Sequence, residues 1–352
     1  MRIAAAQLIP YRLPLRHPWR SAHGVITHRC GWLVRLVSDE GLIGYGDCAP
    51  LPAAGTETPE LAFEQLQVQL PSLLDNDPQG ALSSLDESGF QAPAARCALE
   101  IALLDLLAQQ TGLPLARRLN PNSALSVRAN AMIGGLADDV GARVEAAQAA
   151  GFTVLKLKVG LAEPKIEVAQ LRRLAGMLEA GVSLRLDANG AWTSAQALAF
   201  VEGLFDLPIE SLEEPLAQPE IGQLQQLQAL AAFPLALDES LARIDIDTLL
   251  RKMVVRRLVL KPMVLGGVRP AYALARRAAL AGMECVATTA VDSAVGVLAA
   301  VHLAVALDNE LAHGLATSSW LLSDVGSVPR LESGRMLLNA HMNGLGFHAK
   351  LE

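Results

Sequence analysis

The chain has 352 residues, of which 51% are apolar and 4% aromatic, and its formal net charge is −7. This length allows one large domain or two or three smaller ones, and the apolar content is enough for a sizeable core built mainly from Ala, Leu and Val. The acidic balance argues against a nucleic acid or an anionic membrane as partner, because binding to phosphate groups needs a basic surface.

The cysteine pattern and the N-terminal segment argue against export. The four cysteines are scattered and form no CxxC pair, so we expect buried, reduced thiols. Residues 1–15 lack the apolar core of a secretory signal, because polar residues and a proline interrupt them. No uncharged apolar run reaches about 18 residues, so we expect no membrane-spanning helix and a cytoplasmic location.

Residues 1 to about 50 are expected to be rich in β-strands. The segment RIAAAQLIPYRLPL alternates loosely between apolar and polar residues, and the apolar runs on either side of Asp39-Glu40-Gly41 predict a β-hairpin. Residues 17–29, between the first two strands, contain many polar and Gly residues, and we expect a loop there.

The following residues are expected to be mainly helical. Thr58 is placed to cap a helix that begins at Pro59. A second helix, from Ala94 to Gln110, is apolar over more than half of its circumference, which predicts burial between layers. The Asn- and Pro-containing segment 119–124 suits a linker. We therefore predict an α+β domain over residues 1–120.

From residue 121 onward, strand-like and helix-like segments alternate strictly. The strands are expected to start near Leu125, Thr153, Val182, Glu210, Pro234, Val255, Glu284 and Leu311. Seven helix-like runs lie between them, so the pattern predicts a parallel α/β barrel over residues 121–318 and disfavours a doubly wound sheet. Residues 319–352 are rich in turns, and we expect them to pack back onto the N-terminal domain.

Three acidic residues end consecutive predicted strands. Asp187, Glu213 and Asp238 lie 25 or 26 residues apart. In a parallel barrel the C-terminal strand ends surround one mouth, where barrel enzymes carry their chemistry. Three hard oxygen donors with no nearby His or Cys favour Mg²⁺, or Mn²⁺, over zinc. The alternative is that these carboxylates only bond to neighbouring lysines.

Three lysines share the predicted mouth. Lys156 and Lys158 lie two apart on one strand, so both would face the barrel interior, and Lys261 ends a strand on the other side. Mutual repulsion and partial burial are expected to lower the pKa of a lysine, as a base requires, while the carboxylates and a metal act in the opposite direction. The alternative is a set of structural lysines in salt bridges.

Such a site suits removal of the weakly acidic proton next to a carboxylate. A divalent ion that holds the carboxylate stabilises the dianion, one lysine takes the proton, and the other supports the transition state or acts on the opposite face. Return of a proton gives racemisation or epimerisation. Loss of a β-leaving group gives dehydration or cycloisomerisation.

Five ordered motifs resemble those of the enolase superfamily, in its muconate-lactonising branch. They are the KxK of Lys156 and Lys158, DANGAW at Asp187, EEP at Glu213, DES at Asp238 and Glu239, and Lys261. The resemblance spans essentially the whole chain. It implies an α+β capping domain, a (β/α)7β barrel, a C-terminal return to the cap, a Mg²⁺ ion and a small-molecule carboxylate substrate.

Within this branch the chain is most similar to the o-succinylbenzoate synthase family. The similar segments are GYGDCAPLP, LRLDANGAWT, LDESL, LKPMVLGG, TTAVDSAVG and AHGLAT. The resemblance implies dehydration of 2-succinyl-6-hydroxy-2,4-cyclohexadiene-1-carboxylate to 2-succinylbenzoate in menaquinone biosynthesis. By the same resemblance, Lys158 would handle the proton and Lys261 would stabilise the intermediate from the other face of the ring.

Other readings stay open. Dipeptide epimerases, N-acylamino acid racemases and muconate cycloisomerases use the same machinery, and a barrel retained only for binding or assembly is a non-enzymatic alternative. The seventh strand carries Asp292-Ser293 and lacks the Asp-x-Asp pair by which many dipeptide epimerases hold the substrate ammonium, which weakens that reading. Asp47 of the cap stands where the family usually has Glu. The oligomeric state stays open, with a homo-oligomer among the expectations.

A further set of residues is expected to bind the substrate or orient the ligands. The set comprises Arg20, Lys156, Arg185, Asn189, Glu239, Thr288 and Thr289. By resemblance, the loop from Arg20 to Gly24 and the segment around Thr56 close the site, with an ordinary exposed loop as an equal alternative. Thr288 and Thr289 end the seventh strand and are placed to bond a substrate carboxylate, unless they are plain β-forming residues.

Overall fold

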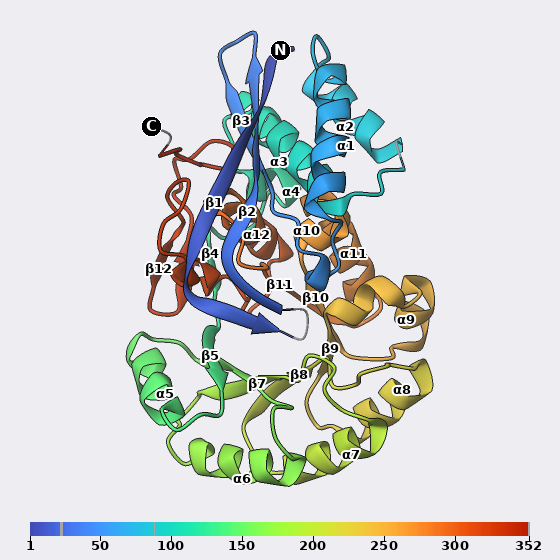
Figure 1. Ribbon diagram of the computed structural model, residues 1–352, viewed down its shortest axis with the longest axis vertical. Coiled ribbons are helices and arrows are strands. Elements are labelled where there is room, and N and C mark those ends of the chain that lie inside the picture. Colours follow the sequence, from blue (N-terminus) through green and yellow to red (C-terminus); the bar gives the residue numbers. More distant parts are fainter. Residues whose placement is uncertain (22–23, 88, 351–352) are drawn as a thin grey trace.

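The N-terminal part of the chain is an antiparallel sheet in the order β1-β2-β3, described in a computed structural model that covers residues 1–21, 24–87 and 89–350 (Figure 1). Its strands are β1 (Ile3–Ser21), β2 (Gly24–Ser38) and β3 (Ile43–Cys48). Val37 pairs with Ile43 on either side of the turn at 39–41, which confirms the predicted hairpin.

The prediction of a loop over residues 17–29 is wrong for the described part of that segment. Trp19 pairs with Ile26 and Arg20 with Val25, so the two strands continue as a ribbon. In an exposed antiparallel ribbon, polar side chains face water while the backbone groups still pair, so polarity did not exclude a strand. Residues 22–23, in the middle of the expected closing loop, lie outside the described residues.

Helices cover one face of this capping sheet. They are η1 (Pro52–Ala54), α1 (Pro59–Ser72), α2 (Pro78–Glu87), α3 (Pro93–Gln110) and α4 (Leu115–Leu119). The Thr58 side chain accepts a hydrogen bond from the backbone N–H of Leu61, which confirms the predicted cap of α1. The backbone of α3 packs directly on β3, since a Cβ added to Gly46 would lie 1.8 Å from the carbonyl oxygen of Ala98.

The second part of the chain is a parallel sheet wrapped by helices (Figure 1). In order across the sheet, the strands are β11 (Glu284–Ala287), β10 (Arg257–Leu260), β9 (Leu235–Leu237), β8 (Ile209–Glu213), β7 (Ser183–Asp187), β6 (Val154–Lys158) and β5 (Ala131–Gly135). The helices are α5 (Val140–Ala149), α6 (Pro164–Ala175), α7 (Ser194–Gly203), α8 (Ile221–Leu230), η2 (Glu239–Arg243), α9 (Ile246–Lys252), α10 (Pro262–Leu265), α11 (Val268–Leu280), α12 (Ala294–Leu307) and η3 (Ala316–Trp320).

The two ends of this sheet meet through isolated bridges. Ala129 pairs with His313, and Thr288 pairs with Gly314, in the parallel sense. The strand expected near Leu311 is therefore only a pair of bridges. The run expected to open the barrel near Leu125 forms β4 (Ser126–Arg128), which belongs to another sheet. Short apolar runs do not reveal which sheet they join, because period and composition are the same in both.

The C-terminal residues connect the barrel to the cap. β12 (Arg330–Glu332), β13 (Arg335–Leu337) and β4 form a third, antiparallel sheet. Further along, the backbone N–H of Leu345 donates to the Asp105 carboxylate of α3 at 2.8 Å. The domain limits at residues 120 and 318 stay a prediction.

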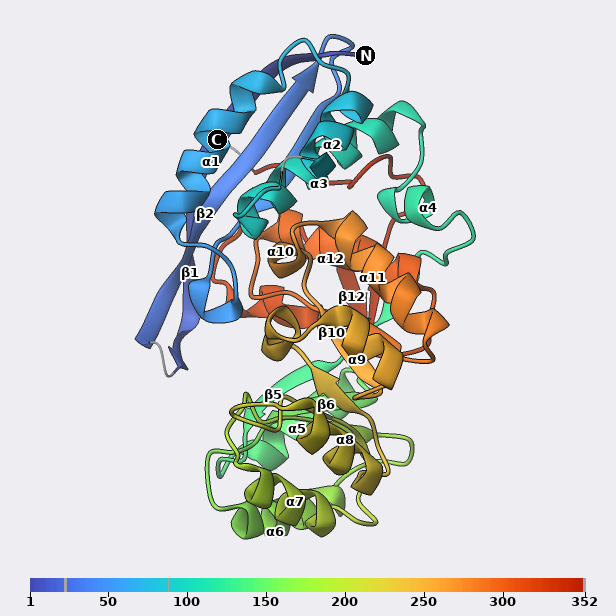
Figure 2. The same ribbon diagram turned by 90° about the vertical axis from the view of Figure 1, so that its right-hand side faces the viewer.

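Figures 1 and 2 show the capping sheet at one end of the molecule and α6 and α7 at the other, with α10, α11 and α12 between them. Within the described part of the chain, no helix combines the length and the apolar content needed to cross a lipid bilayer.

Candidate active site

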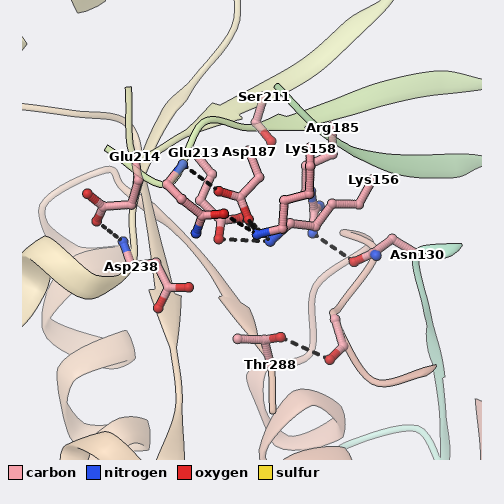
Figure 3. A network of polar contacts seen from close by, with 12 residues as sticks. Asn130, Lys156, Lys158, Arg185, Asp187, Ser211, Glu213, Glu214, Asp238 and Thr288 are labelled. Carbon is pink, nitrogen blue, oxygen red and sulfur yellow. Dashed lines mark hydrogen bonds and ion pairs between the residues drawn. The ribbon is translucent and has the colours of Figure 1, made fainter. Parts of the chain in front are cut away.

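The register of the barrel strands brings the charged residues to one edge of the sheet. Lys158 on β6 is paired with Asp187 on β7, and Asp187 with Glu213 on β8. Glu213 is paired with Ala236 on β9, and Asp238 follows two residues later. Because the C-terminal ends of parallel strands lie at one edge, these side chains lie close together at the barrel mouth (Figure 3).

Lys156 bridges two of the three acids. Its Nζ lies 2.8 Å from Oδ2 of Asp187 and 2.8 Å from both carboxylate oxygens of Glu213. Burial lowers the pKa of Lys156, but the charges of Asp187, Glu213 and Asp238 outweigh burial and raise it above its usual value. Lys156 is therefore a fixed positive charge between the two carboxylates.

Lys158 projects to the same side of β6 as Lys156, as residues two apart on a strand do. Its Nζ lies 2.7 Å from Oδ2 of Asp187 and 2.5 Å from Oδ1 of Asn189. Asn189 has a φ of 45° and donates its backbone N–H to Oδ1 of Asp187, a conformation that Asn tolerates better than most residues. Lys158 is half-buried, so its ammonium group is within reach of a ligand in the mouth.

Lys261 follows β10 and pairs with the third acid. Its Nζ lies 2.6 Å from Oδ2 of Asp238 and 3.4 Å from Oε1 of Glu239. Burial lowers the pKa of Lys261, but the charges of Asp238 and Glu239 are stronger and raise it. Of the opposing effects expected on the pKa of a lysine at the mouth, the carboxylates therefore have the larger one at Lys261.

The three acids have the chemistry that a hard divalent cation needs. Asp187, Glu213 and Asp238 are all buried and offer only carboxylate oxygens. As placed, no group of three or more His, Cys, Asp or Glu side chains in the described residues stands close enough to hold a metal ion. The carboxylate oxygens of these acids contact lysine ammonium groups instead. The donor set thus fits Mg²⁺, provided that the carboxylates turn away from Lys156.

Glu214 is a site residue that the sequence reasoning missed. Its Oε1 accepts the backbone N–H groups of Asp238 at 2.6 Å and Ser240 at 2.8 Å, and its Oε2 accepts the Ser240 hydroxyl (Figure 3). Glu214 also has a φ of 46°. Its carboxylate ties the end of β8 to the end of β9 and so orients Asp238. The second Glu of the Glu-Glu-Pro motif was the available signal.

Arg185 lies one layer below Asp187 inside the barrel. Its guanidinium donates to both carboxylate oxygens of Glu210, at 3.0 and 3.1 Å, and to Oδ1 of Asn130 at 3.2 Å (Figure 3). Arg257 on β10 also contacts Glu210, at 2.5 Å. Arg185 therefore joins β7 to β8 beneath the mouth. Any influence of Arg185 on Asp187 is transmitted through the backbone of β7.

Thr288 and Thr289 follow β11, at the mouth, and Thr56 belongs to the cap. The Thr288 hydroxyl donates to the carbonyl of Gly314 at 3.0 Å, and the Thr289 hydroxyl bonds that of Thr317. The Thr56 hydroxyl accepts the backbone N–H of Leu51 at 2.5 Å. The side chain of Arg20 lies outside the described part of the structure, so its expected role stays a prediction.

Two family profiles match the chain. The profile described as mandelate racemase / muconate lactonizing enzyme, N-terminal domain, matches residues 4–119, and the profile described as enolase C-terminal domain-like matches residues 139–352.

Named relatives share about a quarter of the sequence. The chain is 27% identical over 312 residues to an N-succinyl-L-Arg/Lys racemase of Bacillus cereus, covering 86% of this chain and 84% of the relative. It is 28% identical over 320 residues to a hydrophobic dipeptide epimerase of Enterococcus faecalis, covering 88% of each. The crystal structure of a dipeptide epimerase from Enterococcus faecalis, complexed with Mg and the dipeptide L-Leu-L-Tyr, superposes with a TM-score of 0.89 at 25% identity, covering 99% of each chain.

Proposed function

The chain belongs to the enolase superfamily, in the subgroup of mandelate racemase and muconate lactonizing enzymes, and from this premise we propose that it removes the proton next to the carboxylate of a small substrate. The observation that carries the proposal is the pairing of Lys158 with Asp187 on adjacent strand ends. It places a candidate base directly beside a candidate ligand for the ion that would hold the carboxylate.

Each charged residue has a role in this proposal. Asp187, Glu213 and Asp238 would hold Mg²⁺, which would supply positive charge to stabilise the negative charge that develops on the substrate carboxylate. Lys158, as the neutral amine, accepts the proton and becomes an ammonium group, and Asn189 orients its Nζ atom. Lys261, held by Asp238 after β10, acts from the other side of the mouth: in racemisation it donates a proton to the opposite face of the carbon, and in dehydration it supports the transition state electrostatically.

The comparisons favour return of the proton as the outcome. The relatives reported above are named as a racemase and an epimerase, and both names describe inversion at a carbon atom. We therefore propose racemisation or epimerisation of an amino acid derivative as the leading reaction, ahead of dehydration.

The part of the rim formed by the ends of β11 and of the closing segment has no acidic residue, which favours an N-acylated substrate over a dipeptide with a free ammonium group. The closing segment is the stretch around His313 and Gly314, whose bridges join the two ends of the barrel sheet. The residues that follow β11 are Thr288-Thr289-Ala290, the closing segment continues with Gly314-Leu315-Ala316-Thr317, and none of these is acidic. Asp292, the nearest acid along the chain, is buried and lies 4.0 Å from Arg29 of the cap. A succinyl or other acyl group needs no anionic partner, whereas an ammonium group does.

A second candidate is the dehydration that forms 2-succinylbenzoate. The same part of the rim favours it, because its substrate also carries a succinyl group and no ammonium. Segments LKPMVLGG and AHGLAT, similar to the o-succinylbenzoate synthase family, lie at the ends of β10 and of the closing segment. Both candidates begin with the same proton abstraction.

One experiment separates these outcomes. The protein with Mg²⁺ is incubated in D₂O with a panel of N-succinyl amino acids and dipeptides, and deuterium at the α-carbon is followed by NMR. In parallel, formation of 2-succinylbenzoate from its cyclohexadiene precursor is measured. Exchange on N-succinyl amino acids supports racemisation, and aromatic product without exchange supports dehydration. Folded, Mg²⁺-loaded protein that is inactive in both assays would refute the proposal.

A further inference from the structure

The segment from Thr288 to Ser293, which follows β11 and forms part of the rim, is held in a strained conformation. Val291 has a φ of 58°, in the left-handed region that β-branched residues rarely adopt. Such strain persists only where the surroundings enforce it. The groups that enforce it here come from the cap.

Arg29 of β2 bonds this segment to the cap. Its Nε donates to the carbonyl of Val291 at 3.1 Å, and its two Nη atoms donate to the carbonyls of Ala49 at 2.8 Å and Pro50 at 3.3 Å. Arg29 is only 3% exposed. One buried guanidinium therefore joins the strained residue to the chain that follows β3.

Asp47 of β3 holds the other end of the same segment. Its Oδ2 accepts the backbone N–H of Ser293 at 3.0 Å, and its Oδ1 accepts the Tyr11 hydroxyl at 2.7 Å. There is no free space around it, because a Cβ added to Gly296 would lie 2.6 Å from Oδ2 of Asp47. The position and orientation of this carboxylate are thus set by the cap.

Apolar contacts complete the attachment. Val291 packs in a small cluster with Leu13, Leu15 and Leu321, and Ala290 packs with Leu51 and Ala54. In these clusters the other partners of both side chains belong to the cap or to the C-terminal segment, which contributes Trp320, Leu321 and Val325. The barrel alone therefore gives this segment little that would hold Val291 at a positive φ.

Asp292 makes only a long ion pair with Arg29, whereas the backbone carbonyls have the shorter contacts with this guanidinium. Its Oδ1 is buried and has no hydrogen-bond partner among the described residues, and the nearest Arg29 nitrogen, at 4.0 Å, already donates to a carbonyl. Burial and the charge of Asp47 raise the pKa of Asp292 to about 7, while Arg29, the backbone N–H of Ala290 and Lys261 act in the opposite direction.

We propose that Arg29 and Asp47 are positioning residues, through which the cap fixes the conformation of the barrel mouth on the side where the substrate binds. The effect that we expect on kinetics rests on the proposed function. They hold Thr288 to Ser293 against the cap, so that the rim next to Thr288 keeps one shape. Neither residue touches the proposed metal ligands in any contact of the described residues, so metal binding and rim geometry are separable.

Hydrogen exchange tests the proposal without any substrate. In Arg29→Gln and Asp47→Ala, peptides covering 288–296 should lose protection, while peptides covering β6 to β8 keep theirs. Asp47→Asn retains an acceptor oxygen and should restore protection in part. Arg256→Gln is the matched control, because Arg256 donates to the carbonyl of Ala231 at the N-terminal ends of β9 and β10, whereas residues 288–293 follow the C-terminal end of β11. Unchanged exchange at 288–296, or a uniform increase throughout the chain, would overturn the proposal.

Kinetics then tests the consequence for the substrate. With a substrate from the panel, Arg29→Gln should lower kcat/KM by up to about 100-fold, as misplacement of a site wall does, with unchanged Mg²⁺ affinity by calorimetry. An unchanged kcat/KM would contradict a positioning role. If the wild type has no turnover but exchange at 288–296 responds as expected, the proposed function fails and the structural role of Arg29 and Asp47 stands.

Discussion

The ammonium nitrogen of Lys158 lies 2.7 Å from Oδ2 of Asp187, so the proposed base and a proposed metal ligand contact each other directly. The two residues are also register partners on adjacent strands. A cation at Asp187 would compete with Lys158 for this oxygen and leave the ammonium free to face the substrate. Metal binding and the availability of the base therefore both depend on Oδ2 of Asp187.

Replacing Lys158 with Met should remove α-proton exchange without unfolding the protein. Loss of a general base typically lowers the rate about 10²- to 10⁴-fold, and Met retains most of the apolar stem of Lys. Deuterium incorporation by NMR measures the rate, and thermal unfolding measures integrity. Lys165→Met on α6, an exposed lysine, is the control. Exchange at the wild-type rate in Lys158→Met would rule out this residue as the base.

Magnesium should stabilise the wild type, and the acids should be needed for this effect. A ligand that binds only the folded state raises stability by about 2.7 kcal/mol at 100 times its Kd. We expect Mg²⁺ to raise the Tm of the wild type and to have little effect on Asp187→Asn or Glu213→Gln. Differential scanning fluorimetry with and without EDTA measures the shift. An equal Mg²⁺ shift in the variants would place the ion elsewhere.

Lys156 supplies a further comparison for the same measurement. Its ammonium group neutralises Asp187 and Glu213 when no metal is bound. Lys156→Met should therefore lower the Tm of the metal-free protein and enlarge the Mg²⁺-induced rise, because the buried acids lose their partner. A smaller rise than in the wild type would show that Lys156 helps to shape the metal site.

Removing the Glu214 carboxylate should weaken metal binding, although Glu214 is not a proposed ligand. Residues that orient ligands typically contribute about 10- to 100-fold to metal affinity. Glu214→Ala frees the backbone of Asp238 and Ser240, whereas Glu214→Gln keeps an acceptor for both N–H groups. We expect Mg²⁺ affinity by calorimetry to fall in the Ala variant and to recover in the Gln variant. Glu220→Ala, at an exposed position, is the control.

The strand ends at the mouth could be predicted because their signal is local. Asp187, Glu213 and Asp238 each follow a short apolar run, and the regular spacing of the runs indicates the barrel. The helix expected from AVGVLAAVHLAVAL coincides with α12 (Ala294–Leu307). Where period, composition and turn residues agree, the sequence is sufficient.

The contacts between cap and barrel could not be predicted, because they join distant parts of the chain. Arg29 and Val291 are 262 positions apart, and nothing in either neighbourhood marks them as partners. The separation of β4 from the barrel has the same origin, since its partner β13 lies at the other end of the sequence. The role of Glu214 was hidden because an acid beside a proposed ligand looks like a second ligand.

Glu100 on α3 should contribute stability that is lost as the pH rises from about 5 to about 7, while the buried His302 and His313, whose pKa values burial lowers, contribute in the opposite direction. Burial raises the pKa of the Glu100 carboxyl from 4.5 to about 7, although the backbone N–H of Arg269 and the charge of Arg96 act in the opposite direction. Between these values Glu100 is more protonated in the folded chain than in the unfolded chain, so its contribution to the free energy of unfolding decreases with pH. The loss is about 3 kcal/mol at most, complete above the folded pKa.

Glu100→Gln should flatten this dependence. Oε2 of Glu100 accepts the N–H groups of Val268 at 2.5 Å and Arg269 at 3.2 Å, at the start of α11, and a Gln oxygen replaces it there without a titrating proton. Urea unfolding of both proteins at pH 5 and pH 8 measures the difference, with exposed Glu87→Gln as the control. We expect the variant to lose less stability than the wild type between these pH values. Equal losses would mean that Glu100 is ionised in the folded protein throughout this range.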